Sequence, residues 1–394
     1  MQLVETRTNR VNGKNDAVRT ERTGPREERR WAWMDNLRVA VIAGVVVTHV
    51  AITYVLDIDW YYEERTANPI TEAIVAAVIL PAALFALATL FLIAGLLSQR
   101  SLARKGPRAF VQDRLVRLGV PLAAFVVLIG PLTSIVGQRA ERNPSADDAG
   151  SFFMDEMRRA DTGPMWFVTA LLVFSILYGA WRWARPASAT VQPLQPRHLV
   201  VAGAAIVFGS FVVRLAWPFT ADTPLSLNLW EWPQMATLFA FGALAGERGW
   251  LEPIPDWLRR TCARAGIVGV ATLLVVVAAV AMARDDDVFL GGWHLQAVAE
   301  PAAEAALAVA MSLWLLGWFS RRWTYNGPLA RALGRASFAA YILHAPVVVL
   351  LAVGFRSVGV AGEIKFVTVA TLGFATSFAV GWLVTRVRPF SHLL

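Results

Sequence analysis

The sequence predicts an all-α protein built as a polytopic transmembrane helical bundle, and three observations carry this prediction. Of the 394 residues, 56% are hydrophobic and only 17% are charged, against about 25% in an average soluble domain. The mean hydropathy is +0.49. The apolar residues also gather in blocks of about 20, the length that a helix needs to cross a hydrocarbon layer of roughly 30 Å. Together these observations exclude an ordinary soluble domain.

Ten apolar segments follow a polar N-terminal stretch. Residues 1–30 are polar and basic, with no apolar run that would make a signal peptide, so we expect a disordered cytoplasmic tail there. Residues 31–394 form the transmembrane domain. Its segments are expected at residues 35–56, 72–97, 112–136, 164–184, 198–217, 231–248, 264–283, 296–319, 337–355 and 364–385.

The distribution of positive charge predicts the orientation of these helices. With the N-terminus in the cytoplasm, 28 of the 37 Lys and Arg fall on the cytoplasmic side, 8 on the outer side, and Arg214 lies within a segment. Membrane proteins concentrate Lys and Arg in cytoplasmic loops. We therefore expect both termini in the cytoplasm of a multi-pass plasma-membrane protein. The net charge of +8 reflects this topology and not nucleic-acid binding, because the arginines lie between apolar blocks.

The first segment carries two ionisable residues, Arg38 and His49, which are eleven positions apart. Eleven residues of α-helix make about three turns, or about 16 Å, so both side chains lie on one face. With Arg38 at the cytoplasmic interface, His49 reaches the middle of the bilayer. A titratable group at that depth is a functional candidate, and neutral imidazole can accept a proton from a hydroxyl. The alternative is a structural histidine bonded to a neighbouring helix.

Arg114 and Arg117 open the third segment, three positions apart and on one helix face. Two guanidinium groups at a helix N-terminus form a good phosphate site, because the backbone N–H groups there also favour anions. The alternative is ordinary anchoring to lipid phosphates.

Further candidates lie deeper in the membrane or near its outer face. Glu304 is expected about two turns below the outer surface, where a carboxyl group is protonated or faces a polar cavity. Arg214 lies near the outer end of segment five, and His344 enters segment nine about two turns from the cytoplasmic side. The longest outer loop, at about 137–163, is expected to shape an outer-facing site. No metal-ligand spacing occurs, and a single cysteine, Cys262, excludes an internal disulfide.

Five short motifs, in one order, resemble the acyltransferase 3 family of membrane acyltransferases. They are Arg38 and His49 in "MDNLR…HV", "LFLIAGLL" with Ala94 where Ser is usual, Arg114 and Arg117 running into "RLGVPL", "GPMWFVTALLVF", and "SFAAYILHAPVVV" with a Tyr-x-x-His-x-Pro pattern. The stretch from "RLAWPF" to "GERGWLEPIP" is most similar to the branch that includes periplasmic glucan succinyltransferases, which also has Glu at the position of Glu304. Ala94 indicates that its stretch serves packing in this chain.

The resemblance implies an enzyme that moves an acyl group, acetyl or succinyl, from cytoplasmic acyl-CoA to a hydroxyl of an outer acceptor, often a glycan. It implies that Arg38, Arg114 and Arg117 hold the CoA phosphates. His49 would be the general base or a transient acyl carrier, with Glu304 as a second catalytic residue. Candidates for orienting His49 or binding the acceptor are Arg214, Trp166 and His344. It implies no permanently bound cofactor, and the sequence leaves the oligomeric state open.

A transporter of an anionic metabolite or a lipid-linked sugar is the alternative from another functional class. It would use the same polar pathway through the membrane. The chain shows no internal repeat, whereas many transporters are built from duplicated halves.

Overall fold

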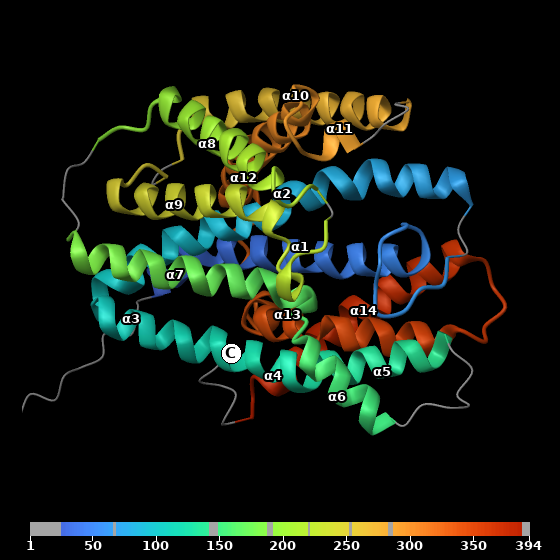
Figure 1. Ribbon diagram of the computed structural model, residues 1–394. Helices are drawn as coiled ribbons and strands as arrows, with labels where there is room; N and C mark the ends of the chain where they lie inside the picture. Colours follow the sequence, from blue (N-terminus) through green and yellow to red (C-terminus); the bar gives the residue numbers. More distant parts are fainter. Residues whose placement is uncertain are drawn as a thin grey trace, which may run out of the picture.

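The computed structural model describes residues 25–65, 68–141, 149–186, 192–219, 221–251, 254–282 and 287–387. Within these ranges the chain is helical and contains no β-strand, which confirms the all-α prediction. Figure 1 shows the long helices running side by side in one bundle. The expected tail at residues 1–30 lies outside the described ranges up to residue 24, and α1 begins at Pro25.

The described chain contains fourteen α-helices and six shorter helical turns. The α-helices are α1 (Pro25–Tyr54), α2 (Pro69–Lys105), α3 (Pro107–Arg114), α4 (Val120–Ala124), α5 (Gly130–Glu141), α6 (Ala149–Arg159), α7 (Trp166–Ala184), α8 (Pro196–Arg214), α9 (Trp232–Arg248), α10 (Asp256–Met282), α11 (Asp287–Leu290), α12 (Ala299–Arg322), α13 (Pro328–Phe355) and α14 (Gly362–Val384). The turns are η1 (Leu115–Gly119), η2 (Phe125–Ile129), η3 (Gly163–Met165), η4 (Pro224–Ser226), η5 (Leu229–Glu231) and η6 (Gln296–Val298).

Nine helical stretches in the described ranges are long and apolar enough to cross a membrane. They correspond to nine of the ten expected segments. The other expected segment, 231–248, forms α9, which has 17 residues and is therefore about 26 Å long.

Helix α9 runs antiparallel to α8 over the same thickness of the bundle. Near the end of α8, Gly209 lies against Pro233 at the start of α9. At the other end of the pair, the ring of Trp250, just after α9, stacks on His198 at the start of α8, with 4.5 Å between the ring centroids. α9 therefore lies alongside α8 over nearly its whole length, although in the described part of the chain it is not among the nine stretches long enough to cross a membrane.

The third membrane segment contains two wider π turns, each ending two residues before a proline. η1 ends at Gly119, before Pro121, and η2 ends at Ile129, before Pro131. Proline inside a helix lacks the N–H donor and clashes with the carbonyl four residues earlier. A local π turn absorbs this mismatch. The first of these turns contains Arg117, so its spacing from Arg114 is not purely α-helical.

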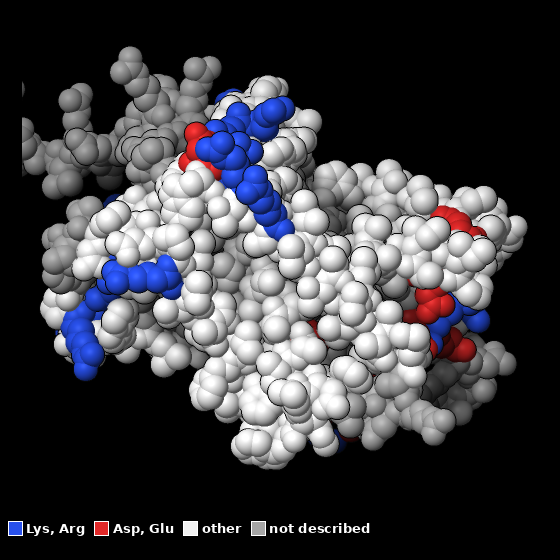
Figure 2. Space-filling model, turned by 90° about the horizontal axis from the view of Figure 1, so that it is seen from above, with Lys and Arg blue, Asp and Glu red and all other residues white. Residues whose placement is uncertain are grey.

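The two ends of the bundle differ in charge. The α1–α2 and α13–α14 connections lie at the same end, at the right in Figure 1, and α3 begins at the opposite end. On the face shown in Figure 2, Lys and Arg gather towards one end, an uncharged band covers the middle, and Asp and Glu gather mainly at the other end. This arrangement is the one expected for a membrane protein with a basic cytoplasmic face.

Helices α2 and α9 pack backbone to backbone through small residues. A Cβ atom at Gly95 would collide with the carbonyl oxygen of Phe239, and one at Gly242 would collide with that of Leu92. Glycine allows such close approach, which is a common way for helices to associate in membranes. The contact fixes the position of α2, the helix that lines the candidate site.

Several helices extend beyond the apolar segments that predicted them. α2 continues to Lys105 and α13 begins at Pro328, whereas the sequence placed these boundaries at residues 97 and 337. α6 also occupies part of the stretch 137–163, which we expected to be a loop. Hydropathy marks the part of a helix inside the hydrocarbon and misses polar turns that project from it.

Candidate functional site

His49 lies in α1, one turn before the helix ends, with its ring held by a backbone hydrogen bond. Its Nδ1 atom is 2.8 Å from the carbonyl oxygen of Val45. Because a carbonyl only accepts hydrogen bonds, Nδ1 is the protonated nitrogen of the neutral ring, and Nε2 keeps its lone pair. The side chain is therefore oriented and carries the tautomer that a base requires.

Two rings flank His49. The ring centroid of Trp60, from the α1–α2 connection, is 4.3 Å away, and that of His344, from α13, is 4.7 Å away. His344 is buried, its Nδ1 donates to the carbonyl of Tyr341, and its Nε2 has no hydrogen-bond partner in the described part of the chain. A second accepting nitrogen thus lies close to His49.

The depth of His344 differs from the expectation. Because α13 begins at Pro328, His344 lies about 24 Å along its helix, at 1.5 Å for each residue. It therefore reaches the level of His49 instead of lying two turns inside the cytoplasmic surface.

A cavity borders His49 between α1, α2, α13 and the start of α7. Trp166 and Tyr341 form part of its wall. The rest of the lining comes from α1 and α2 and is mainly aliphatic, including Val45, Ile79 and Leu87.

A second cavity brings together the three arginines that the sequence singled out. Arg38 from α1, Arg114 from the end of α3 and Arg117 from η1 all line it. Three guanidinium groups around one cavity form a site for a multiply charged anion, and phosphate is the group that arginine binds best in this way. Ala94, the residue that stands where Ser is usual, also lines this cavity.

Arg114 has unsatisfied hydrogen-bonding capacity in this cavity. Its guanidinium lies over the ring of Phe110, at 5.2 Å, and 3.4 Å from the hydroxyl of Ser98. Its buried Nε has no partner within the described ranges. The neighbouring carboxylate of Asp113 pairs with Lys105 at 2.9 Å and Arg117 at 3.2 Å. Arg114 is half-buried, and a partly buried cation without its own carboxylate is available to a ligand anion.

The two cavities lie end to end and share Tyr341 as a wall. The hydroxyl of Tyr341 donates to the carbonyl of Pro164, which fixes the ring at this junction. On α2, lining positions follow one another at helical spacing from Leu97 in the arginine cavity to Val78 in the His49 cavity. One face of α2 therefore forms a wall common to both, about 28 Å long.

Arg214 and Glu304 meet in a different place, between α8 and α12. The two side chains are 2.7 Å apart and are 2% and 0% exposed. Arg214 also pairs with Glu300, and Glu231 hydrogen-bonds with Gln234 of α9 beside them. None of these residues lines either cavity, and no hydrogen bond or ring contact of the described residues joins them to His49.

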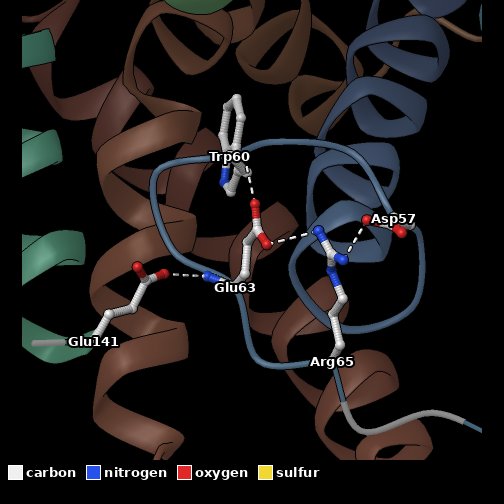
Figure 3. Close-up of polar contacts among 5 residues, drawn as sticks. All are labelled: Asp57, Trp60, Glu63, Arg65 and Glu141. Carbon is white, nitrogen blue, oxygen red and sulfur yellow. Dashed lines mark hydrogen bonds and ion pairs between the residues drawn. The ribbon is translucent and has the colours of Figure 1, made fainter.

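The outer side of His49 is covered by residues 56–65, which we call the outer cap, through the ring of Trp60. Figure 3 shows the polar contacts of this segment. The backbone N–H of Trp60 donates to Glu63 at 3.1 Å, and Arg65 pairs with Glu63 at 2.7 Å and also with Asp57. The backbone N–H of Glu63 donates to Glu141 of α5 at 2.8 Å. These contacts hold the indole of Trp60 against His49.

A second group of contacts ties the outer cap to α14. Lys365 pairs with Glu64, and the hydroxyl of Tyr62 donates to Glu64 at 3.2 Å. Burial and the charge of Glu64 raise the pKa of Tyr62 to about 12. Tyr62 therefore stays protonated and keeps this hydrogen bond at any physiological pH.

The structure thus groups most of the candidates into one site and leaves two apart. One cavity is lined by His49 and Trp166, and His344 packs against the ring of His49. The arginine cavity is lined by Arg38, Arg114 and Arg117. Arg214 and Glu304 form the separate ion cluster. Tyr341, the tyrosine of the Tyr-x-x-His-x-Pro pattern, was not among the site candidates, although it lies three positions before His344 and so on the same helix face. Trp60 was not among the candidates either.

Comparison with known proteins gives one result. A family model described as an acyltransferase domain, acyltransferase 3, matches residues 31–386. No curated protein and no solved structure matches the chain. Within the described ranges no group of three or more His, Cys, Asp or Glu is placed to hold a metal ion.

Proposed function

The chain belongs to the acyltransferase 3 family and is a membrane acyltransferase, and from this premise we propose that it transfers an acyl group from cytoplasmic acyl-CoA to a hydroxyl of an outer acceptor. The supporting observation is the pair of cavities that places three arginines at one end and His49 at the other. A plasma-membrane location, a glycan as acceptor, and acetyl or succinyl as acyl group complete the proposal.

The arginine cavity would hold the phosphates of CoA. Arg38 and His49 lie about 16 Å apart along α1, a span suited to the extended pantetheine arm. With the phosphates at Arg38, Arg114 and Arg117, the thioester would pass Tyr341 and stop beside His49. Acyl-CoA is then a substrate and no resident cofactor is needed.

His49 would act as the general base. Its Nε2 takes the proton of the acceptor hydroxyl while the hydroxyl oxygen attacks the thioester carbonyl carbon. The carbon–sulfur bond breaks, and the proton passes from His49 to the CoA thiolate, so that the products are the ester and CoA. In a second possible order, Nε2 first accepts the acyl group and then passes it to the hydroxyl, with the same products.

The other candidates would act around this step. The Nε2 of His344, which has no partner within the described ranges, would accept a hydrogen bond from a second hydroxyl of the acceptor. Trp166 would form the wall against which the reacting groups lie. Arg214 and Glu304, which do not contact His49, would hold α8 and α12 together and so shape the acceptor side.

The test uses membranes that contain the protein and acyl-CoA labelled in the acyl group. Cells with and without the gene are compared by mass for surface glycans and secreted products, and a gain of one acetyl or succinyl unit identifies the acceptor class. We expect His49→Gln to lower label transfer by at least 100-fold, since general bases contribute about 10²–10⁴. The matched control is His198→Gln, because His198 lies at the start of α8 against Trp250.

Normal turnover by a folded His49→Gln variant would refute the assignment of His49. Failure of the protein to bind any CoA species would refute the donor. Label that stays on the protein in a single turnover, and is lost with His49→Gln, would favour the acyl-carrier order.

A further inference from the structure

The cavity beside His49 has a different chemistry from the arginine cavity. It encloses about 260 Å³, and no charged side chain lines it apart from the titratable His49 itself. Its α1 side is formed by Gly44 and Val45, and its α2 side by Ile79, Ala83 and Leu87 among others. The lining residues on α2 are all alanine, valine, isoleucine or leucine, so this wall offers no polar side chain.

This cavity also opens sideways, between α1 and α2, towards the hydrocarbon. Gly44 and Ala83 are exposed, and Val78 is 67% exposed. A Cβ atom at Gly44 would meet no atom within 4 Å, so open space lies over that glycine. A chain too long for the cavity has a path into the lipid.

The position of the cavity indicates its occupant. Along α1, Arg38 and Ile42 line the arginine cavity, and Val45 and His49, further along the helix, line the apolar cavity. Tyr341 lines both cavities. A thioester held beside His49 by phosphates at the arginine end must place its acyl chain in the remaining space. That space is the apolar cavity.

We propose that the apolar cavity is the acyl-chain pocket and that it accepts uncharged acyl groups in preference to succinyl, so that of the two groups named in the proposed function it favours acetyl, and longer uncharged chains bind more tightly still. The inference rests on the proposed function, because it assumes acyl-CoA as donor. Each methylene moved from water into an apolar site strengthens binding by about fourfold. The terminal carboxylate of a succinyl group would lose its hydration there without a partner.

Equilibrium binding to the whole protein in lipid nanodiscs tests the proposal without an acceptor. The probes are CoA, acetyl-CoA, butyryl-CoA, hexanoyl-CoA and succinyl-CoA. We expect butyryl-CoA to bind roughly 15-fold more tightly than acetyl-CoA, from its two extra methylenes. Succinyl-CoA, which is of similar length, should bind at least tenfold more weakly than butyryl-CoA.

A pair of matched variants distinguishes this cavity from general partition into the lipid. Gly44→Leu fills the open space over Gly44 and should make acetyl-CoA and butyryl-CoA bind with equal affinity while CoA binding is kept. Gly203→Leu is the control, since a Cβ atom at Gly203 of α8 also meets nothing within 4 Å and Gly203 lines neither cavity. It should keep the full dependence on chain length. If Gly44→Leu does not fold, Ala83→Leu replaces it, with exposed Ala77→Leu on the same helix as its control.

The outcomes separate the two proposals. Affinity that does not depend on chain length, succinyl-CoA that binds as well as butyryl-CoA, or a length dependence that survives Gly44→Leu would overturn the acyl-chain pocket and leave the proposed function intact. If neither CoA nor any acyl-CoA binds, the proposed function fails, and the pocket fails with it.

Discussion

Replacing Arg214 by Met tests whether the buried ion cluster serves stability or chemistry. Arg214 is 2% exposed and pairs with Glu304, which is 0% exposed, and with Glu300, which is 11% exposed. Met has a similar length and no charge. The variant therefore leaves two carboxyl groups, together with the nearby Glu231, buried without their cation.

The expected loss of stability is about 3–5 kcal/mol, the cost of removing one partner from a buried ion pair. Solvent screening does not reduce this value much, because the partners are buried. The exposed pair Arg158–Asp155 gives the control: its side chains are 71% and 62% exposed, and Arg158→Met should cost about 0–1 kcal/mol. Glu304→Gln keeps an oxygen that can accept from Arg214 and should cost less than Arg214→Met.

The assay is denaturant unfolding of the purified protein in micelles, with label transfer measured on the fraction that remains folded. If Arg214→Met and Arg158→Met unfold at the same denaturant concentration, the reasoning about the cluster is wrong. If Glu304→Gln is as stable as the wild type but transfers no label, Glu304 takes part in the reaction, as the family resemblance implies.

Two further predictions concern the ends of the route. Arg114→Gln should weaken CoA binding roughly tenfold or more, since a hydrogen bond to a charged group contributes about 1.5–3 kcal/mol. Unchanged CoA binding in a calorimetric titration would exclude Arg114 from the phosphate site. Lys365→Met should break the pair with Glu64 and speed amide hydrogen exchange in residues 57–65, measured by mass spectrometry. Arg158→Met is the control and should leave this exchange unchanged. Equal exchange in the two variants would show that the Lys365–Glu64 pair does not hold the outer cap.

Properties set by one helix could be predicted from the sequence. Hydropathy located the spans because burial in hydrocarbon depends on local composition. The helical repeat placed Arg38 and His49 on one face of α1, and both line the connected cavities. Arg117 was expected beside Arg114, and both line the arginine cavity, although the π turn that contains Arg117 was not foreseen.

Properties that depend on which helices are neighbours could not be predicted in the same way. The family resemblance implied Glu304 as a second catalytic residue, and no pattern in the sequence indicated that the packing of α8 against α12 would pair it with Arg214. Trp60 was not among the candidates, but the outer cap folds it back onto His49. The Arg214–Glu304 contact joins residues 90 positions apart, and the Trp60–His49 contact depends on how the irregular α1–α2 connection folds, so no helical repeat specifies either.

The surroundings of His49 explain why this chemistry suits the interior of a membrane protein. A thioester beside a base is open to attack by water as well as by the acceptor. Trp60 and His344 cover two sides of the His49 ring, and aliphatic residues line much of the adjoining cavity. Excluding water favours transfer over hydrolysis. It also favours the neutral imidazole, since a cation would be costly there, and only the neutral ring has a lone pair to receive the proton.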